Sequence, residues 1–103
     1  MVSKNVQDAI PKIRNYFTGQ PIKKAWLFGS CSRGEETADS DVDILVQYDR
    51  KNCRISLMKI TGIILGLEDI LKRKVDLVED GQLLPFAQQT ADHDRFLIYE
   101  RED

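Results

Sequence analysis

The stretch LFGSCSRGEETADSDVDILV, residues 27–46, decides how this chain folds and contains most of its candidate chemistry. The apolar run Ile22–Phe28 predicts a buried strand that ends inside this stretch. Residues 29–40 are polar and include two glycines, so they predict a loop with at most one helical turn. Residues 42–46 alternate with period two, which is typical of a second strand. The stretch therefore predicts a strand, a polar loop and another strand.

Working outward, apolar residues recur at helical spacing on both sides of this unit, with Pro11 expected to shift or kink the first helix. The remaining expected elements, in chain order, are an amphipathic helix over 4–18, a long helix over 54–73, a strand over 74–78, a turn at Gly81, a weak helix over 83–92, and a strand or helical turn over 96–99. This order predicts an α/β (α+β) fold with a small mixed β-sheet. Helices are expected mainly on one face, because the second and third strands show a polar side.

Length and composition limit the classes of function. The 103 residues suit a single domain over 1–103, with no room for a second core. Fifteen basic against 17 acidic residues leave a net charge of -2, which argues against a stable complex with long nucleic acid. Two cysteines without CxxC spacing and the lack of an 18-residue apolar run predict a cytoplasmic protein that does not cross a membrane.

Asp41 and Asp43 are the first candidate metal ligands. Side chains at i and i+2 of a strand point the same way, about 7 Å apart at Cα, so both carboxylates share one face. Their repulsion is most simply relieved by a divalent cation, and oxygen ligands favour Mg²⁺ or Mn²⁺. The alternative is a solvated strand face.

Asp76 is a third candidate, because it is a carboxylate in the middle of an otherwise apolar strand. If its strand lies beside the second one, Asp76 reaches the face that carries Asp41 and Asp43. Three such carboxylates can hold two metal ions for in-line phosphoryl displacement. The alternative is an ion pair between Asp76 and a basic residue of the segment 72–74.

The loop offers candidate nucleotide-binding groups. Gly29 lets the backbone approach a ligand, the Ser30 hydroxyl can donate to a phosphate, and the Arg33 guanidinium can pair with one. Ser30 as a helix cap and Arg33 in a surface salt bridge with Glu35 or Glu36 are the plainer alternatives.

These residues resemble a known family. Leu27-Phe28-Gly29-Ser30, followed after ten residues by Asp41-Val42-Asp43-Ile44, is similar to the signature of the DNA polymerase β-like nucleotidyltransferases. The run from Gly29 to Val46 most resembles the minimal nucleotidyltransferases, although Cys31 stands where family members often carry Arg. The resemblance implies metal binding by Asp41, Asp43 and Asp76, and triphosphate binding by Gly29 and Ser30.

The resemblance also implies a function: AMP transfer from ATP to a tyrosine of a small helical HEPN-type toxin, with this chain as the antitoxin. Two alternatives remain open. One is a non-catalytic antitoxin that masks its partner by docking, and the other is transfer to a small molecule, with a homodimer closing the site. A further hypothesis assigns an exposed partner surface on the 54–73 helix to Ile63 and Leu67.

Overall fold

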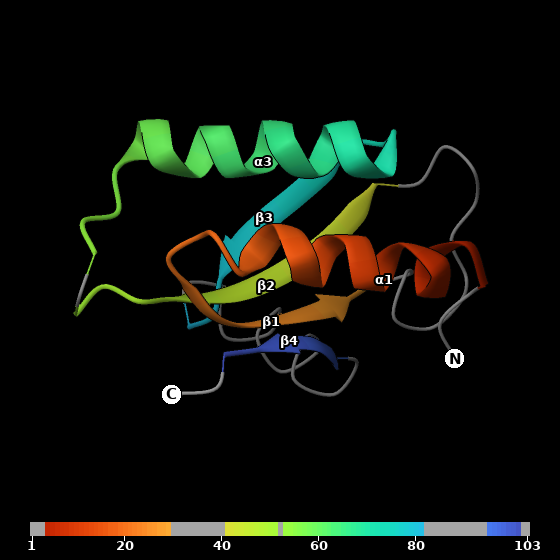
Figure 1. Cartoon of the computed structure of the whole chain (residues 1–103), viewed down its shortest axis with the longest axis horizontal. Coiled ribbons are helices and arrows are strands. Elements are labelled where there is room, and N and C mark those ends of the chain that lie inside the picture. Colours follow the sequence, from red (N-terminus) through yellow and green to blue (C-terminus); the bar gives the residue numbers. More distant parts are fainter. Residues whose placement is uncertain (1–3, 30–40, 52, 82–94, 102–103) are drawn as a thin grey trace.

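The computed structural model describes residues 4–29, 41–51, 53–81 and 95–101 (Figure 1). The elements, in chain order, are α1 (Lys4–Phe17), β1 (Ile22–Phe28), β2 (Val42–Tyr48), α3 (Leu57–Leu71), β3 (Val75–Glu79) and β4 (Phe96–Glu100). The 96–99 segment is thus a strand rather than a helical turn. The loop expected over 30–40 and the helix expected over 83–92 lie outside the described residues.

The four strands form one sheet in the order β3-β2-β1-β4. β1 pairs antiparallel with both β2 and β4, whereas β2 and β3 run parallel and are joined through α3. Figure 1 shows α1 and α3 on the same side of this sheet. The prediction of a mixed sheet with helices on one face is confirmed.

Local signals set the ends of the helices. Ser56 caps α3 by accepting a hydrogen bond from the Lys59 backbone N–H at 3.1 Å. Lys72 ends the helix in the left-handed conformation, with φ of 57°. The helix is therefore shorter than the 54–73 range predicted. α1 begins at Lys4, well before Pro11, so the proline lies inside the helix without shifting its start.

The main core lies between the helices and the sheet. Side chains from α1, α3 and all four strands meet there, among them Phe17, Leu27, Ile44, Leu67 and Ile98, each with no exposed surface. Ile63 belongs to the same core and is 1% exposed. The hypothesis that Ile63 and Leu67 form a partner surface is therefore wrong, because these positions are the buried stripe of an amphipathic helix.

The opposite face of the sheet is less polar than predicted. Trp26 of β1 and Leu45 of β2 are buried there, with Phe28 and Val78 packed against them. Arg95 lies over the Trp26 ring at 4.7 Å and pairs with Asp80 at 3.1 Å. This face thus has an apolar centre bordered by charged groups, and the candidate carboxylates lie on it.

Candidate active site

Three neighbouring strands bring the candidate residues to one edge of the sheet. Phe28, the last residue of β1, is opposite Asp43 in β2, and Asp43 is opposite Asp76 in the parallel strand β3. Paired residues of adjacent strands point to the same face, so Asp43 and Asp76 share the face away from the helices. Asp41, two residues before Asp43, immediately precedes β2. The predicted adjacency of Asp76 to Asp43 is confirmed.

The charges at this edge raise the pKa of Asp43. Partial burial of its carboxyl, reinforced by the nearby charges of Asp76 and Asp41, raises that pKa from 3.8 to about 6. Asp43 is half-buried, whereas Asp41 and Asp76 are exposed. Asp43 is therefore the central carboxylate, and an ionised Asp43 needs a compensating positive charge close by.

Gly29 packs directly against this carboxylate. Its φ is +70°, in the left-handed region that favours glycine, and a Cβ built on it would lie 2.6 Å from Asp43 Oδ2. The turn after β1 thus holds its backbone against the acid with no space for a side chain. Backbone at such a close approach can offer amide groups to a ligand that sits beside the carboxylate.

The described residues do not form a complete set of metal ligands. Over residues 4–29, 41–51, 53–81 and 95–101, no three His, Cys, Asp or Glu side chains are grouped so that they could hold a metal ion. The strand positions of the three acids are together, but their oxygens are not gathered. Because Asp41 and Asp76 are exposed, each can change rotamer toward a cation at little steric cost. The oxygen-only donor set fits Mg²⁺ or Mn²⁺.

Two matters remain from the sequence analysis: the positions of Ser30 and Arg33, and the alternative basic partner of Asp76. Ser30 and Arg33, with Cys31 between them, lie outside the described residues. The basic residue Lys72, considered as a partner for Asp76, instead contacts Asp69 at 3.5 Å. That ion pair lies at the end of α3, so Lys72 pairs with Asp69 rather than with Asp76.

Two ion pairs near the sheet were not anticipated. Asp49, 6% exposed, accepts from Arg101 at 2.7 Å, and Asp80 accepts from Arg95. No local motif signals either pair, because the partners are far apart in sequence. Only the antiparallel return of the chain along β1 to form β4 could have suggested them.

A mixed sheet with helices on one face and aspartates on the other is the arrangement of a nucleotidyltransferase. The chain belongs to that family: the family model described as polymerase beta, nucleotidyltransferase, matches residues 11–103. A relative in Methanocaldococcus jannaschii, MJ1379, assigned as a protein adenylyltransferase, is 39% identical over 79 residues. The match covers 76% of each chain.

Solved structures share the fold. A toxin–antitoxin complex with AMP-PNP contains a chain that superimposes with a TM-score of 0.74 at 21% identity, covering 90% of this chain and 74% of that one. A MNT antitoxin in complex with a tri-AMPylated HEPN toxin from Shewanella oneidensis gives a TM-score of 0.67 at 20% identity, covering 92% and 72%. Within the described part of this chain, no helix combines the length and apolarity needed to cross a bilayer.

Proposed function

We propose that this chain transfers AMP from ATP to a hydroxyl group of a protein partner. The observation that carries the proposal is the alignment of Asp43 with Asp76 on parallel strands, with Gly29 pressed against Asp43. Family membership and the adenylyltransferase relative support the reaction class. A small helical HEPN-type protein is the proposed acceptor, supported by the fold shared with an antitoxin bound to an AMPylated HEPN toxin. Because the reaction consumes ATP, we expect it in the cytoplasm.

The proposed reaction is an in-line displacement at phosphorus. The acceptor oxygen bonds to the α-phosphorus of ATP while the bond from that phosphorus to the bridging oxygen breaks, and pyrophosphate leaves. Asp76, exposed beside Asp43, is the proposed acceptor of the hydroxyl proton. Gly29 and Ser30 would hold the β- and γ-phosphates through the turn after β1.

Asp41, Asp43 and Asp76 are the residues that would hold two Mg²⁺ or Mn²⁺ ions. Bound there, the ions would supply Lewis-acid activation of the acceptor oxygen and neutralise the leaving pyrophosphate. The raised pKa of Asp43 supports this assignment, because a cation beside the carboxylate would lower that pKa and stabilise the ionised form. Catalysis would rest mainly on positioning and charge neutralisation.

A second candidate is an antitoxin that docks without transferring AMP. It is favoured by one observation: the carboxylates of the described residues are not gathered into a complete ligand set. Both candidates use the same partner, so partner binding alone does not separate them. Metal-dependent nucleotide binding and covalent AMP on the partner do.

The experiment is a calorimetric titration of ATP into the purified chain with Mg²⁺, followed by mass spectrometry of a HEPN-type partner incubated with both. The wild type should bind ATP only with the metal and add AMP to the partner. Asp41→Ala/Asp43→Ala should do neither, whereas Asp8→Ala, an exposed acid on α1, should behave as wild type. Partner binding without metal-dependent ATP binding or AMP would favour the docking antitoxin. AMP transfer by the double variant would overturn the assignment of the acids.

A further inference from the structure

The segment that leads into α3 and forms most of it carries basic side chains and no acid. Residues 50–67 contain four basic residues and no aspartate or glutamate, although acids make up 17 of the 103 residues. The first turn of α3 likewise has no acid and contains Lys59, whose charge opposes the helix dipole. Helix stability alone would favour an acid there. Folding therefore does not explain the positive charge of this segment.

Most of this charge is not neutralised within the described part of the chain. Lys51, Arg54 and Lys59 are exposed, and none of them forms an ion pair with an acid of the described residues. The fourth basic residue, Arg50, donates two hydrogen bonds to the Glu79 carboxylate, at 2.8 and 2.6 Å. That carboxylate is thus already paired. Three cations at the start of α3 therefore remain available to an anionic group from outside.

Two large apolar side chains lie among these charges. Leu57 is 80% exposed and Met58 is 86% exposed, which makes them the most exposed large hydrophobic side chains of the described residues. Both belong to the first turn of α3, together with Lys59. Charged and apolar groups thus share one small surface at the start of the helix. We define the basic-apolar surface by its five exposed residues: Lys51, Arg54, Leu57, Met58 and Lys59.

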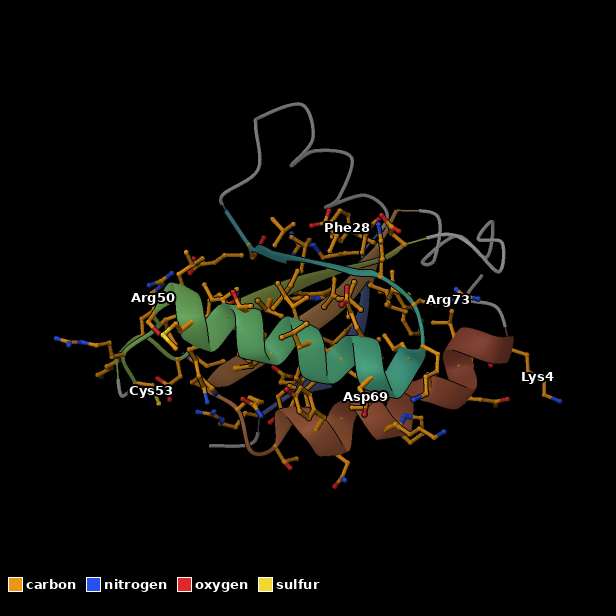
Figure 2. The ribbon with its side chains drawn as sticks, turned by 90° about the horizontal axis from the view of Figure 1, so that it is seen from above. Lys4, Phe28, Arg50, Cys53, Asp69 and Arg73 are labelled. Carbon is orange, nitrogen blue, oxygen red and sulfur yellow. The ribbon has the colours of Figure 1, made fainter. Side chains whose placement is uncertain are left out.

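Arg54 lines two hollows in this part of the molecule. The first is lined by Arg50, Lys51, Cys53, Arg54 and Ile55, and the second by residues 18–21 with Cys53, Arg54, Lys59 and Arg101. No acid of the described residues lines either hollow. Such hollows can admit a carboxylate, which accepts charge-assisted hydrogen bonds from guanidinium and ammonium groups. Figure 2 shows Cys53 near one end of α3 and Arg73 near the other.

We propose that the basic-apolar surface docks a segment of a protein partner that carries acidic residues around apolar ones. Carboxylates of the partner complement the three cations, and its apolar side chains cover Leu57 and Met58. A nucleic acid fits less well, because its phosphates complement the cations but not the two apolar side chains. An anionic bilayer laid along α3 would bring the exposed Asp69 against charges of its own sign.

The basic-apolar surface lies away from the acids of the candidate active site. α3 has 15 residues and is therefore roughly 22 Å long. The surface lies at its start, whereas its end leads directly into β3, which carries Asp76. A segment docked at the start of α3 thus leaves Asp43 and Asp76 open, so the acceptor hydroxyl belongs to another part of the partner. Only the choice of a HEPN-type protein as the probe rests on the proposed function.

The first test measures the affinity of the full chain for a HEPN-type protein by calorimetry, at salt concentrations from about 50 to about 300 mM. Arg54→Glu/Lys59→Glu should weaken binding at least about tenfold at low salt and make it less dependent on salt. The matched control is Lys4→Glu/Lys12→Glu, which makes the same change of charge at two exposed positions of α1. The control should bind as the wild type does.

The second test removes the apolar part of the surface without changing its charge. Leu57→Gln/Met58→Gln should also weaken partner binding at least about tenfold. Leu97→Gln, at an exposed apolar residue of β4, is the control and should retain the affinity of the wild type. Circular dichroism checks that each variant is folded. ATP titration checks the candidate active site, because ATP binding by every one of these variants should equal that of the wild type.

Other outcomes overturn the proposal. It fails if the wild type does not bind the HEPN-type protein, or if either double variant of the surface binds as tightly as the wild type. Binding of single-stranded RNA, or of vesicles of phosphatidylcholine and phosphatidylglycerol, is measured in parallel. If such binding is lost in Arg54→Glu/Lys59→Glu while affinity for the protein is unchanged, the surface binds phosphates instead. Partner binding without AMP transfer removes the proposed activity only, whereas AMP transfer with unchanged partner affinity in these variants removes the docking surface only.

Discussion

Asp43 is the residue at which folding and chemistry conflict most directly. Its carboxyl is partly buried between two other acids, and its pKa of about 6 lies above the ordinary 3.8. The folded protein therefore keeps this proton at pH values where the unfolded chain has released it. The proton supports folding below about pH 4, and that support is lost as the pH rises through about 6.

Asp43→Asn should consequently stabilise the metal-free protein at neutral pH. We expect its melting temperature at pH 7.5 in EDTA to exceed that of the wild type by at least ~3 °C, with little difference near pH 4. Adding Mg²⁺ should raise the melting temperature of the wild type and not of the variant. Asp41→Asn, at an exposed position, serves as the control and should shift the metal-free value less. Equal effects at pH 4 and 7.5 would contradict the electrostatic account.

Gly29 lies in the turn beside Asp43, and Gly81, which lies in another turn, serves as its control. Both have positive φ, +70° and +92°, but only at Gly29 would a Cβ meet Asp43. Each change to Ala should cost about 1–2 kcal/mol of stability through backbone strain. Gly29→Ala should in addition abolish Mg²⁺-dependent ATP binding, whereas Gly81→Ala should retain it, both measured by calorimetry. Equal ATP binding by the two variants would show that the turn does not contact the nucleotide site.

The sequence was informative at this scale where spacing alone determined position. Asp43 and Asp76 share a face because β3 lies parallel to β2 with these two residues in register, and Asp41 immediately precedes β2. What could not be predicted is the side-chain environment. The close approach of Gly29 to Asp43 depends on the φ of one residue, and the pKa of Asp43 depends on burial by distant parts of the chain.

At the scale of elements, α3 shows that the spacing of residues predicts their burial better than the residue type does. Its buried positions Ile63 and Leu67 are four residues apart, as helical spacing requires, whereas Gly62 and Gly66 look equivalent in sequence. In the structure, Gly66 receives the Tyr16 side chain, whose hydroxyl donates to the carbonyl oxygens of Gly62 and Ile63 at 3.4 Å. The two glycines differ because the Tyr16 side chain of α1 lies against Gly66.

The two glycines should therefore respond oppositely to alanine. Gly62→Ala should raise the free energy of unfolding by up to about 1 kcal/mol, since its Cβ meets open space. Gly66→Ala should lower it, because the Cβ would lie 2.1 Å from the Tyr16 hydroxyl and 2.5 Å from the ring. Urea unfolding measures both. In a Tyr16→Ala background, Gly66→Ala should become stabilising, and a persistent loss there would exclude Tyr16 as the cause.

At the scale of the whole molecule, Arg101 connects the segment after β4 to the segments that precede β1 and follow β2. It pairs with the buried Asp49 and donates to the Gln20 carbonyl oxygen at 3.0 Å. Its backbone N–H also bonds to the carbonyl oxygen of Lys23 at 2.8 Å. These contacts join segments some 50–80 residues apart, as the separations of 52 and 81 show.

Arg101→Leu should cost on the order of 2 kcal/mol, because it removes the guanidinium that pairs with the buried Asp49 carboxylate. The matched control is Lys24→Leu, which removes an ion pair with Glu100 in which both side chains are largely exposed. The control should change the midpoint of urea unfolding only slightly. A similar loss in both variants would mean that burial of Asp49 does not matter. ATP binding should be unchanged in either.

The alternation along β2 assigns two separate tasks to neighbouring residues. Val42, Ile44 and Val46 pack in the core beneath the helices, while Asp43 faces the other way. Selection on folding and selection on chemistry can thus act on interleaved positions of one strand without interfering. In a lineage that lost catalysis, Val42, Ile44 and Val46 would stay apolar while the acids were replaced. Loss of the activity would then appear as substitutions at alternate positions along β2.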